Sequence, residues 1–207
     1  MKAGKLAYVI ISTILILVLT SCSNKDFGYG VDKIKNTHSV YNTSIDNYPD
    51  DIDALMGMDN SLKNLKMLKL DSGQKPFELY LDYQLYSTEA NKLFIESQKY
   101  GMKGTTENGF GCRSRKFIVE SSGLRNESAN KGFAMIEKMQ EMMSLYPKES
   151  SEVNLTESRL NFLNITFNAI SKNAKRDASI IDSFCPQNVT DAILADDRFE
   201  DENEEVN

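Results

Sequence analysis

Apolar residues recur at intervals of three and four along four stretches of the chain, at about residues 50–70, 76–100, 113–146 and 154–184. This period places apolar side chains on one face of an α-helix. Pro76 suits the first position of a helix, and Gly101 and Pro147 suit helix ends. The pattern predicts an all-α fold in which three to four helices form an antiparallel bundle over residues 50–186.

Two cysteines, Cys112 and Cys185, flank the third and fourth predicted helices. The turn between these helices centres near Ser150, which lies 38 residues after Cys112 and 35 before Cys185. In an antiparallel hairpin the two sulfurs therefore arrive at the same end. We predict a disulfide that joins the two helices and stabilises the fold by roughly 4 kcal/mol on the chain-entropy estimate. The alternative is a pair of unpaired buried thiols.

The start of the chain has a different pattern. Lys2 and Lys5 are followed by an apolar run over residues 6–19, broken only by Ser12 and Thr13. This run holds about 14 residues, whereas a helix that crosses a bilayer needs roughly 20. A basic start, a short apolar run and small residues before a cleavage point are typical of a secretory signal peptide. We predict such a signal over residues 1–21.

The signal ends at Leu19, Thr20, Ser21 and Cys22. This motif resembles the lipobox of prokaryotic lipoproteins, and the resemblance covers residues 1–22 only. It implies that Cys22 is acylated and becomes the first residue of an exported protein. That protein would be held by its lipid on the outer face of the cytoplasmic membrane or elsewhere in the cell envelope. The alternative is an ordinary signal or an uncleaved anchor with an incidental cysteine. An oxidising environment would favour the Cys112–Cys185 disulfide.

In two segments apolar residues do not recur at a sustained helical spacing. Residues 22–49 are rich in Ser, Asn, Asp, Gly and Tyr, which predicts a lipid-anchored flexible tether with a solvated His38. Residues 187–207 are predicted to form an acidic flexible tail, because eight acids between Asp191 and Glu205 oppose a single Arg198. Removing the signal leaves 22 basic and 30 acidic residues, a net charge of −8. The tail carries most of this charge, so we expect no nucleic-acid binding by the nearly neutral remainder.

The sequence contains little that indicates catalysis. His38 is the only histidine, which argues against a histidine-based metal site, covalent haem or a Ser-His-Asp triad, and no glycine-rich phosphate loop is present. We therefore predict no cofactor, no metal and no enzymatic activity. Paired carboxylates, such as Glu89 with Glu96 or Asp177 with Asp182, leave a small hydrolase as an alternative.

Two details of the predicted helices bear on a binding site. Asp177 falls on the apolar seam of the fourth helix, and we expect that helix to turn slightly and expose Asp177 while burying Ala178. Tyrosines of the second helix, among them Tyr80 and Tyr83, form either part of the core or the lining of a pocket. A pocket lined by these tyrosines would favour a small ligand, whereas a solid core with a large exposed apolar face would favour a protein partner.

Basic residues gather where the second predicted helix ends and the third begins: Lys99, Lys103, Arg113, Arg115 and Lys116. In an antiparallel bundle the predicted tether arrives at the same pole, beside the glycine-rich loop 101–111. This pole is a candidate anion-binding site for lipid headgroups, an anionic polymer or the acidic tail. The alternative is that these charges are solvated and favoured by the helix dipoles.

The leading prediction is a membrane-anchored, non-enzymatic binding or interaction module at the cell envelope. Its partners would be the membrane, through the lipid on Cys22, and an envelope protein or anionic polymer. The alternative is a structural envelope lipoprotein.

Overall fold

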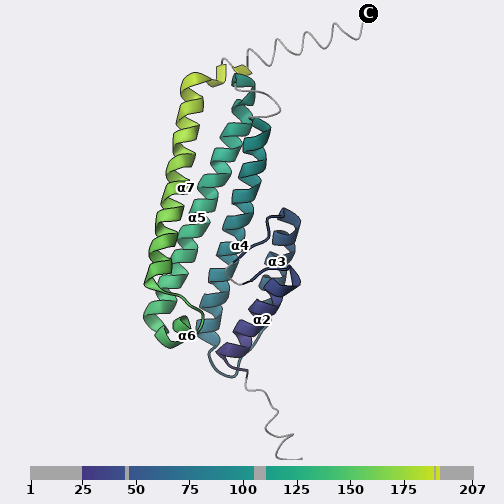
Figure 1. Ribbon diagram of the computed structural model, residues 1–207, viewed down its shortest axis with the longest axis vertical. Helices are drawn as coiled ribbons and strands as arrows, with labels where there is room; N and C mark the ends of the chain where they lie inside the picture. Colours follow the sequence, from purple (N-terminus) through teal and green to yellow (C-terminus); the bar gives the residue numbers. More distant parts are fainter. Residues whose placement is uncertain (1–24, 45–46, 105–110, 189, 192–207) are drawn as a thin grey trace, which may run out of the picture.

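The structure is a computed structural model that describes residues 25–44, 47–104, 111–188 and 190–191. The described residues contain no strand (Figure 1). The α-helices are α2 (Phe27–Val40), α3 (Ile52–Asn64), α4 (Gln74–Met102), α5 (Arg115–Leu145), α6 (Pro147–Glu152) and α7 (Glu157–Phe184). Short 3-10 turns cover Leu65–Met67 and Cys112–Ser114. The predicted all-α antiparallel bundle is confirmed.

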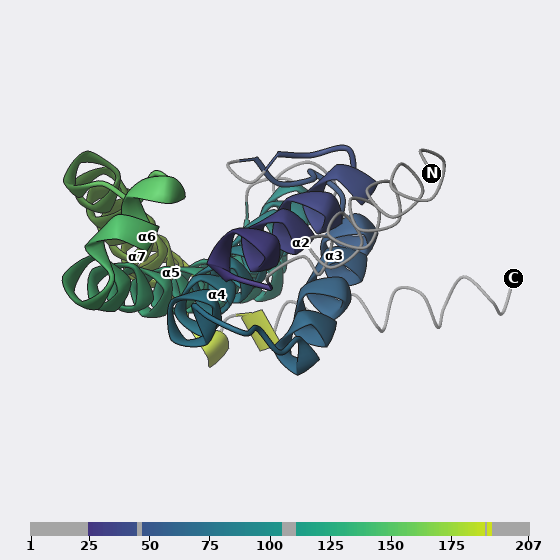
Figure 2. The ribbon, with the colours of Figure 1, turned by 90° about the horizontal axis from the view of Figure 1, so that it is seen from below.

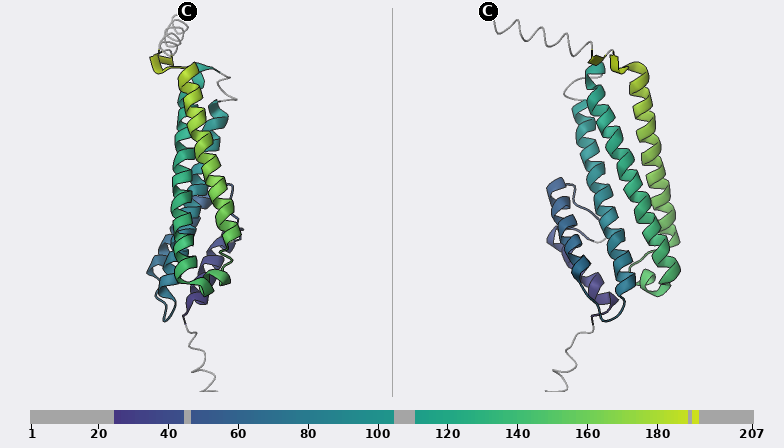
Figure 3. Two further views of the ribbon diagram at one scale, coloured as in Figure 1. Left: turned by 90° about the vertical axis from the view of Figure 1, so that its left-hand side faces the viewer. Right: turned by 180° about the vertical axis from the view of Figure 1, so that it is seen from behind.

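Three long helices form the body of the molecule. α4, α5 and α7 contain 29, 31 and 28 residues, so each is about 42–47 Å long at 1.5 Å per residue. They run antiparallel, with α5 between the other two (Figures 1 and 3). α4 and α7 both pack against α5 and hardly touch each other. The hairpin of α2 and α3 lies against one half of α4 only.

Polar residues before the helices explain where several of them begin. Asp26, Asp51 and Thr156 precede α2, α3 and α7, and each side chain accepts a hydrogen bond from the backbone N–H three residues later. Such caps satisfy a donor that has no partner inside the helix. Gly73 precedes α4 with a φ of 73°, a left-handed conformation that glycine adopts at little cost.

The prediction of a flexible tether over residues 22–49 is wrong for Phe27–Val40, which forms α2. Its buried residues Phe27, Val31, Ile34 and His38 recur at intervals of three and four and form one helical face. This apolar stripe is short, and Gly28 and Gly30 interrupt the helical propensity beside it, which is why composition concealed it. The folded body therefore begins by Lys25 and not at residue 50.

The chain enters the body at the end where α4 begins. The backbone N–H of Lys25 donates to Asp71 Oδ2 at 3.1 Å, and the N–H of Asp71 donates to the Lys25 carbonyl at 2.7 Å. We call this the proximal end. The opposite end of α4, α5 and α7, which holds Cys112 and Cys185, is the distal end (Figure 1). The prediction that the chain arrives at the basic pole is wrong, because α2 adds a helix that the sequence pattern did not reveal.

The predicted cysteine bridge is confirmed. Cys112 and Cys185 are joined with an S–S distance of 2.02 Å and a Cα–Cα distance of 5.1 Å, linking the start of α5 to the end of α7. The predicted tail begins too early at residue 187, because Thr190 is buried and Gln187 accepts a hydrogen bond from Arg115. Residues 192–207 lie outside the described part of the chain.

The core lies mainly in the proximal half, where α2 and α3 cover α4 and the connection after α6 covers α5. Figure 2 shows α2 and α3 beside α4, away from α6 and α7. The side chains in this core that are essentially excluded from solvent are Ile34, Leu55, Met58, Leu62, Phe77, Tyr80, Leu81, Met139 and Met142.

Candidate functional site

A groove runs along the body between α4 and α7, with α5 as its floor. It exists because α4 and α7 both pack on α5 without packing on each other. Three hollows of about 760, 530 and 490 Å³ follow one another along it, and adjacent hollows share lining residues. The principal lining residues are Asn91, Phe94, Gln98 and Met102 of α4, Ser121, Arg125 and Ser128 of α5, and Phe162, Ile165, Thr166, Ala169, Ile170 and Asn173 of α7.

The walls of the groove expose large apolar side chains. Phe162 and Ile165 of α7 are 67% and 72% exposed, and Met102 of α4 is 58% exposed. Ile180 and Phe184 continue the exposed apolar surface of α7 toward the distal end, with Phe184 at 80%. Scattered apolar residues on a surface need no explanation, but a row of them along a groove is typical of an interaction site.

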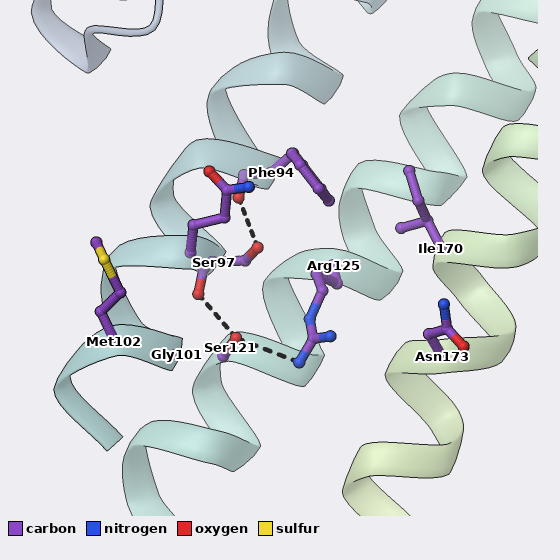
Figure 4. A pocket seen from close by; sticks show the side chains of 9 residues that line it. Phe94, Ser97, Gly101, Met102, Ser121, Arg125, Ile170 and Asn173 are labelled. Carbon is purple, nitrogen blue, oxygen red and sulfur yellow. Dashed lines mark hydrogen bonds between the residues drawn. The ribbon is translucent and has the colours of Figure 1, made fainter. Parts of the chain in front are cut away.

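The distal hollow has a polar centre at Arg125 (Figure 4). Its Nη1 donates to Asp177 Oδ2 at 2.8 Å, and its Nη2 donates to Ser121 Oγ at 3.4 Å. Ser121 Oγ in turn donates to the Ser97 carbonyl at 2.7 Å. The Nε of Arg125 is buried and has no hydrogen-bond partner among the described residues. A guanidinium thus lies in a mostly apolar hollow, with one carboxylate as its counter-charge.

The expectation that Asp177 is exposed is wrong. The side chains of Arg125 and Asp177 are 24% and 26% exposed, so the pair is largely shielded from water. Arg176 also contacts Asp177, at 3.3 Å. A carboxylate on the apolar seam is therefore neutralised by an arginine of α5, which the pattern of the fourth helix alone does not reveal.

The distal half of the body is basic. The segments 92–103, 113–128 and 172–182 contain ten Lys and Arg residues against five Asp and Glu. Of the predicted anion-binding residues, Lys99, Lys103, Arg113 and Lys116 are exposed at the distal end. Arg115 instead binds the end of α7: its Nε donates to the Cys185 carbonyl at 2.9 Å and its Nη2 to Asp182 at 2.6 Å.

Arg115 thus fastens α7 beside the disulfide and does not present an open anion site. Of the glycine-rich loop 101–111, residues 105–110 lie outside the described part of the chain.

His38 is buried, and the prediction that it is solvated is wrong. Its Nε2 lies 3.2 Å from Gln84 Oε1, which also accepts a hydrogen bond from the Tyr48 hydroxyl at 2.9 Å. Gln84 Nε2 donates to the Tyr80 hydroxyl at 3.0 Å. Tyr48 is half-buried and borders the proximal hollow; desolvation of its hydroxyl raises the pKa, so the hydroxyl stays protonated and donates. This buried network joins α2 to α4 and has a structural role.

The tyrosines of α4 belong to the core. The rings of Tyr80 and Tyr83 stack with their centroids 5.8 Å apart, and both residues are buried. Tyr83 only borders the proximal hollow of the groove. Of the two outcomes that the sequence left open, the structure has the solid core and the exposed apolar face.

Three of the four carboxylates considered for catalysis are engaged in ion pairs. Glu89 contacts Lys131 at 3.1 Å, Asp177 contacts Arg125 at 2.8 Å and Asp182 contacts Arg115 at 2.6 Å. Among the described residues no group of three or more His, Cys, Asp or Glu side chains is arranged to hold a metal ion. This arrangement offers the groove, and not a carboxylate cluster, as the candidate site.

No helix in the described ranges is both long enough and apolar enough to span a bilayer. Comparison with protein-family models, with curated proteins and with solved structures finds no significant match. The groove, its apolar walls and its basic charge are therefore the basis on which a function can be proposed.

Proposed function

We propose that the protein is an exported binding protein, anchored to a membrane of the cell envelope by a lipid on Cys22, that holds a helical segment of a partner protein in the groove. The partner helix is amphipathic, with an apolar stripe facing α5 and acidic residues beside it. The signal-like residues 1–21 and the lipobox-like motif support the anchoring part of this proposal.

The observation that carries the binding part is the vacant position between α4 and α7. Three antiparallel helices with the outer two both packed on the middle one resemble a four-helix bundle from which one helix is missing. An amphipathic helix laid in that position would cover Phe162, Ile165 and Phe94 together. Burial of an apolar helix face in such a groove is a recurrent mode of peptide recognition.

Charge supports an acidic partner. Arg159 lines the α7 side of the groove and Arg125 its floor. Arg176 of α7 contacts Asp177, which is the acidic residue paired with Arg125. The α4 side is lined by uncharged residues such as Asn91 and Gln98. Carboxylates beside the apolar stripe of the partner would complement this field and set its orientation.

The distance from Cys22 to the body supports an outward-facing groove. Cys22 precedes Lys25 by three residues, and an extended chain spans at most about 3.6 Å per residue. A lipid on Cys22 would therefore hold the proximal end within roughly 11 Å of the membrane surface. The distal part of the groove would then point away from the lipid, toward partners in the envelope.

Binding can be measured with a labelled designed peptide of about 20 residues, helical, with a leucine stripe flanked by glutamates. We expect it to bind the full chain by fluorescence anisotropy at low salt, and the substitution Ala169→Glu to weaken binding at least tenfold, about 1.4 kcal/mol. Ala169 is exposed on the groove wall. Asn161→Glu, exposed on the same helix but outside the groove lining, is the matched control. No binding by either the wild type or a variant with a neutralised acidic tail would refute the groove function.

Anchoring requires a separate experiment. Metabolic labelling with a fatty acid in a bacterial host should label the wild type and not Cys22→Ser, and only the wild type should fractionate with membranes. An intact signal on a membrane-bound, unlabelled wild type would refute lipidation. Lipidation without any peptide binding would instead favour a structural envelope lipoprotein.

A further inference from the structure

The acidic residues 192–207 directly follow the part of the chain that is packed at the distal end. Thr190 is buried and Asp191 accepts a hydrogen bond from Gln187, which is itself bound to Arg115. The described chain therefore ends, at Asp191, at the distal end of the groove. We propose that the segment 192–207 occupies the distal part of the groove and competes with the partner helix for it.

The composition of the segment matches the site. Residues 192–207 contain seven Asp or Glu residues and one Arg. The distal segments that face them, 92–103, 113–128 and 172–182, have an excess of basic residues of five. Opposite charges of this size attract one another over several ångströms and are screened by salt.

The pattern within the segment matches the shape of the site. Ala192, Ala195, Phe199 and Val206 recur at helical spacing, and the acids fall mostly on the other side of such a helix, together with Ile193 and Leu194. This is the same chemistry that the groove requires of a partner. Phe199 is the largest apolar residue of the segment and would pack in the distal hollow.

The segment 192–207 is long enough to extend along the distal part of the groove. Sixteen helical residues extend about 24 Å, and the helical rise from Phe184 back to Ile170 of α7 is about 21 Å. The segment can therefore reverse direction after Asp191 and cover the distal hollow without displacing any described helix. It would leave the proximal hollow near Phe162 open.

This inference rests on the proposed function of the groove, and its test can refute the competition by residues 192–207 without refuting peptide binding. The experiment uses the full chain in two forms: the wild type, and an amide form in which the seven acids of residues 192–207 are replaced by Asn or Gln. The probe is a labelled synthetic peptide with the wild-type sequence of residues 192–207. Both proteins are first shown to have the same circular dichroism and melting temperature.

We expect the peptide to bind the amide form at least tenfold more tightly than the wild type, because a tethered competitor has an effective concentration on the order of millimolar. Added salt should weaken binding, Arg176→Glu in the amide form should abolish it, and Lys148→Glu at the proximal end should not. Equal weak binding to both forms, or binding unaffected by Arg176→Glu, overturns the inference. If the designed helical peptide still binds in that case, the proposed function stands without this regulation.

Discussion

The two halves of the body are held together in different ways. In the proximal half, α2 and α3 cover α4, and Leu55, Met58 and Leu62 of α3 are fully buried. In the distal half nothing among the described residues covers the groove, and Met102 and Phe184 expose more than half of their surface. The α2 and α3 side of the proximal half therefore uses its apolar residues for folding, whereas the distal half and the groove wall of α7 leave theirs exposed.

The interface between α4 and α5 explains this difference. Toward the distal end the two helices meet through small polar residues, since Ser121 Oγ donates to the Ser97 carbonyl and Ser128 Oγ to the Ala90 carbonyl, each at 2.7 Å. Small side chains bring the helices close but bury little apolar surface. The distal half depends correspondingly more on the disulfide and on Arg115.

The largest expected effect comes from removing that covalent link. The disulfide closes a loop with a sequence separation of 73 residues, so Cys112→Ala with Cys185→Ala should lower the free energy of unfolding by roughly 4 kcal/mol. Urea unfolding followed by circular dichroism measures this loss. Hydrogen exchange should rise first at the end of α7 and only later in α3. Uniform exchange across both halves would contradict the division of the molecule proposed here.

A matched pair of phenylalanines compares the core with the groove wall. Phe77 is 1% exposed and its ring lies against Gly30, whereas Phe162 is 67% exposed on the groove wall. We expect Phe77→Ala to cost about 3–5 kcal/mol of unfolding free energy and Phe162→Ala to change it by less than about 0.5 kcal/mol. Thermal and urea unfolding give both values. A large cost for Phe162→Ala would mean that its side chain belongs to the fold and not to a binding surface.

The sequence predicted the long helices because their apolar residues recur regularly, and it predicted the disulfide because its two cysteines are placed symmetrically about a turn. Period alone placed α4, α5 and α7 within a few residues of their bounds, and the equal spacing of Cys112 and Cys185 from the turn predicted their contact. α2 was missed because its apolar stripe is short and ends in His38. The buried role of His38 depends on Gln84, which lies 46 residues away in sequence.

The groove could not be predicted because its existence depends on which helices pack together. The spacing of apolar residues shows that a helix has a buried face but not which neighbour covers it. It therefore does not distinguish a fourth helix that fills the bundle from a hairpin that covers one side of α4. The exposed apolar residues Phe162 and Ile165 do carry a signal, because they lie beside the regular seam of α7 and widen its apolar face. A wider face than one neighbour can cover indicates a second contact surface.

A smaller effect is expected from the ion pair at the groove floor. Replacing Arg125 with Met keeps much of its volume but leaves the Asp177 carboxylate in a shielded position with only Arg176 nearby. We expect Arg125→Met to lower the free energy of unfolding by about 1–3 kcal/mol. Lys131→Met, which removes the more exposed pair with Glu89, should cost less than about 1 kcal/mol. Equal costs would show that the distal pair is as solvated as the surface pair.

The smallest expected change in stability concerns the hydrogen-bond network around Gln84 in the proximal half, and it depends on pH. Burial raises the pKa of Tyr48 above its usual value of 10.0, so the folded protein keeps this proton at a pH where the unfolded chain loses it. The stabilising contribution is thus fully present below pH 10 and is lost as the pH rises above it. At pH 7, Tyr48→Phe should cost about 1 kcal/mol, because Gln84 loses the hydrogen bond from the hydroxyl.

Above pH 10 the wild type should lose stability more steeply than the variant, by up to about 1.4 kcal/mol per pH unit, so the difference between them shrinks and then reverses. Urea unfolding of both proteins between pH 7 and 11 measures the two slopes, and the other tyrosines and lysines affect both proteins alike. Parallel slopes would mean that water reaches the hydroxyl of Tyr48 in the folded state. The proximal half would then be less tightly closed than its buried side chains indicate.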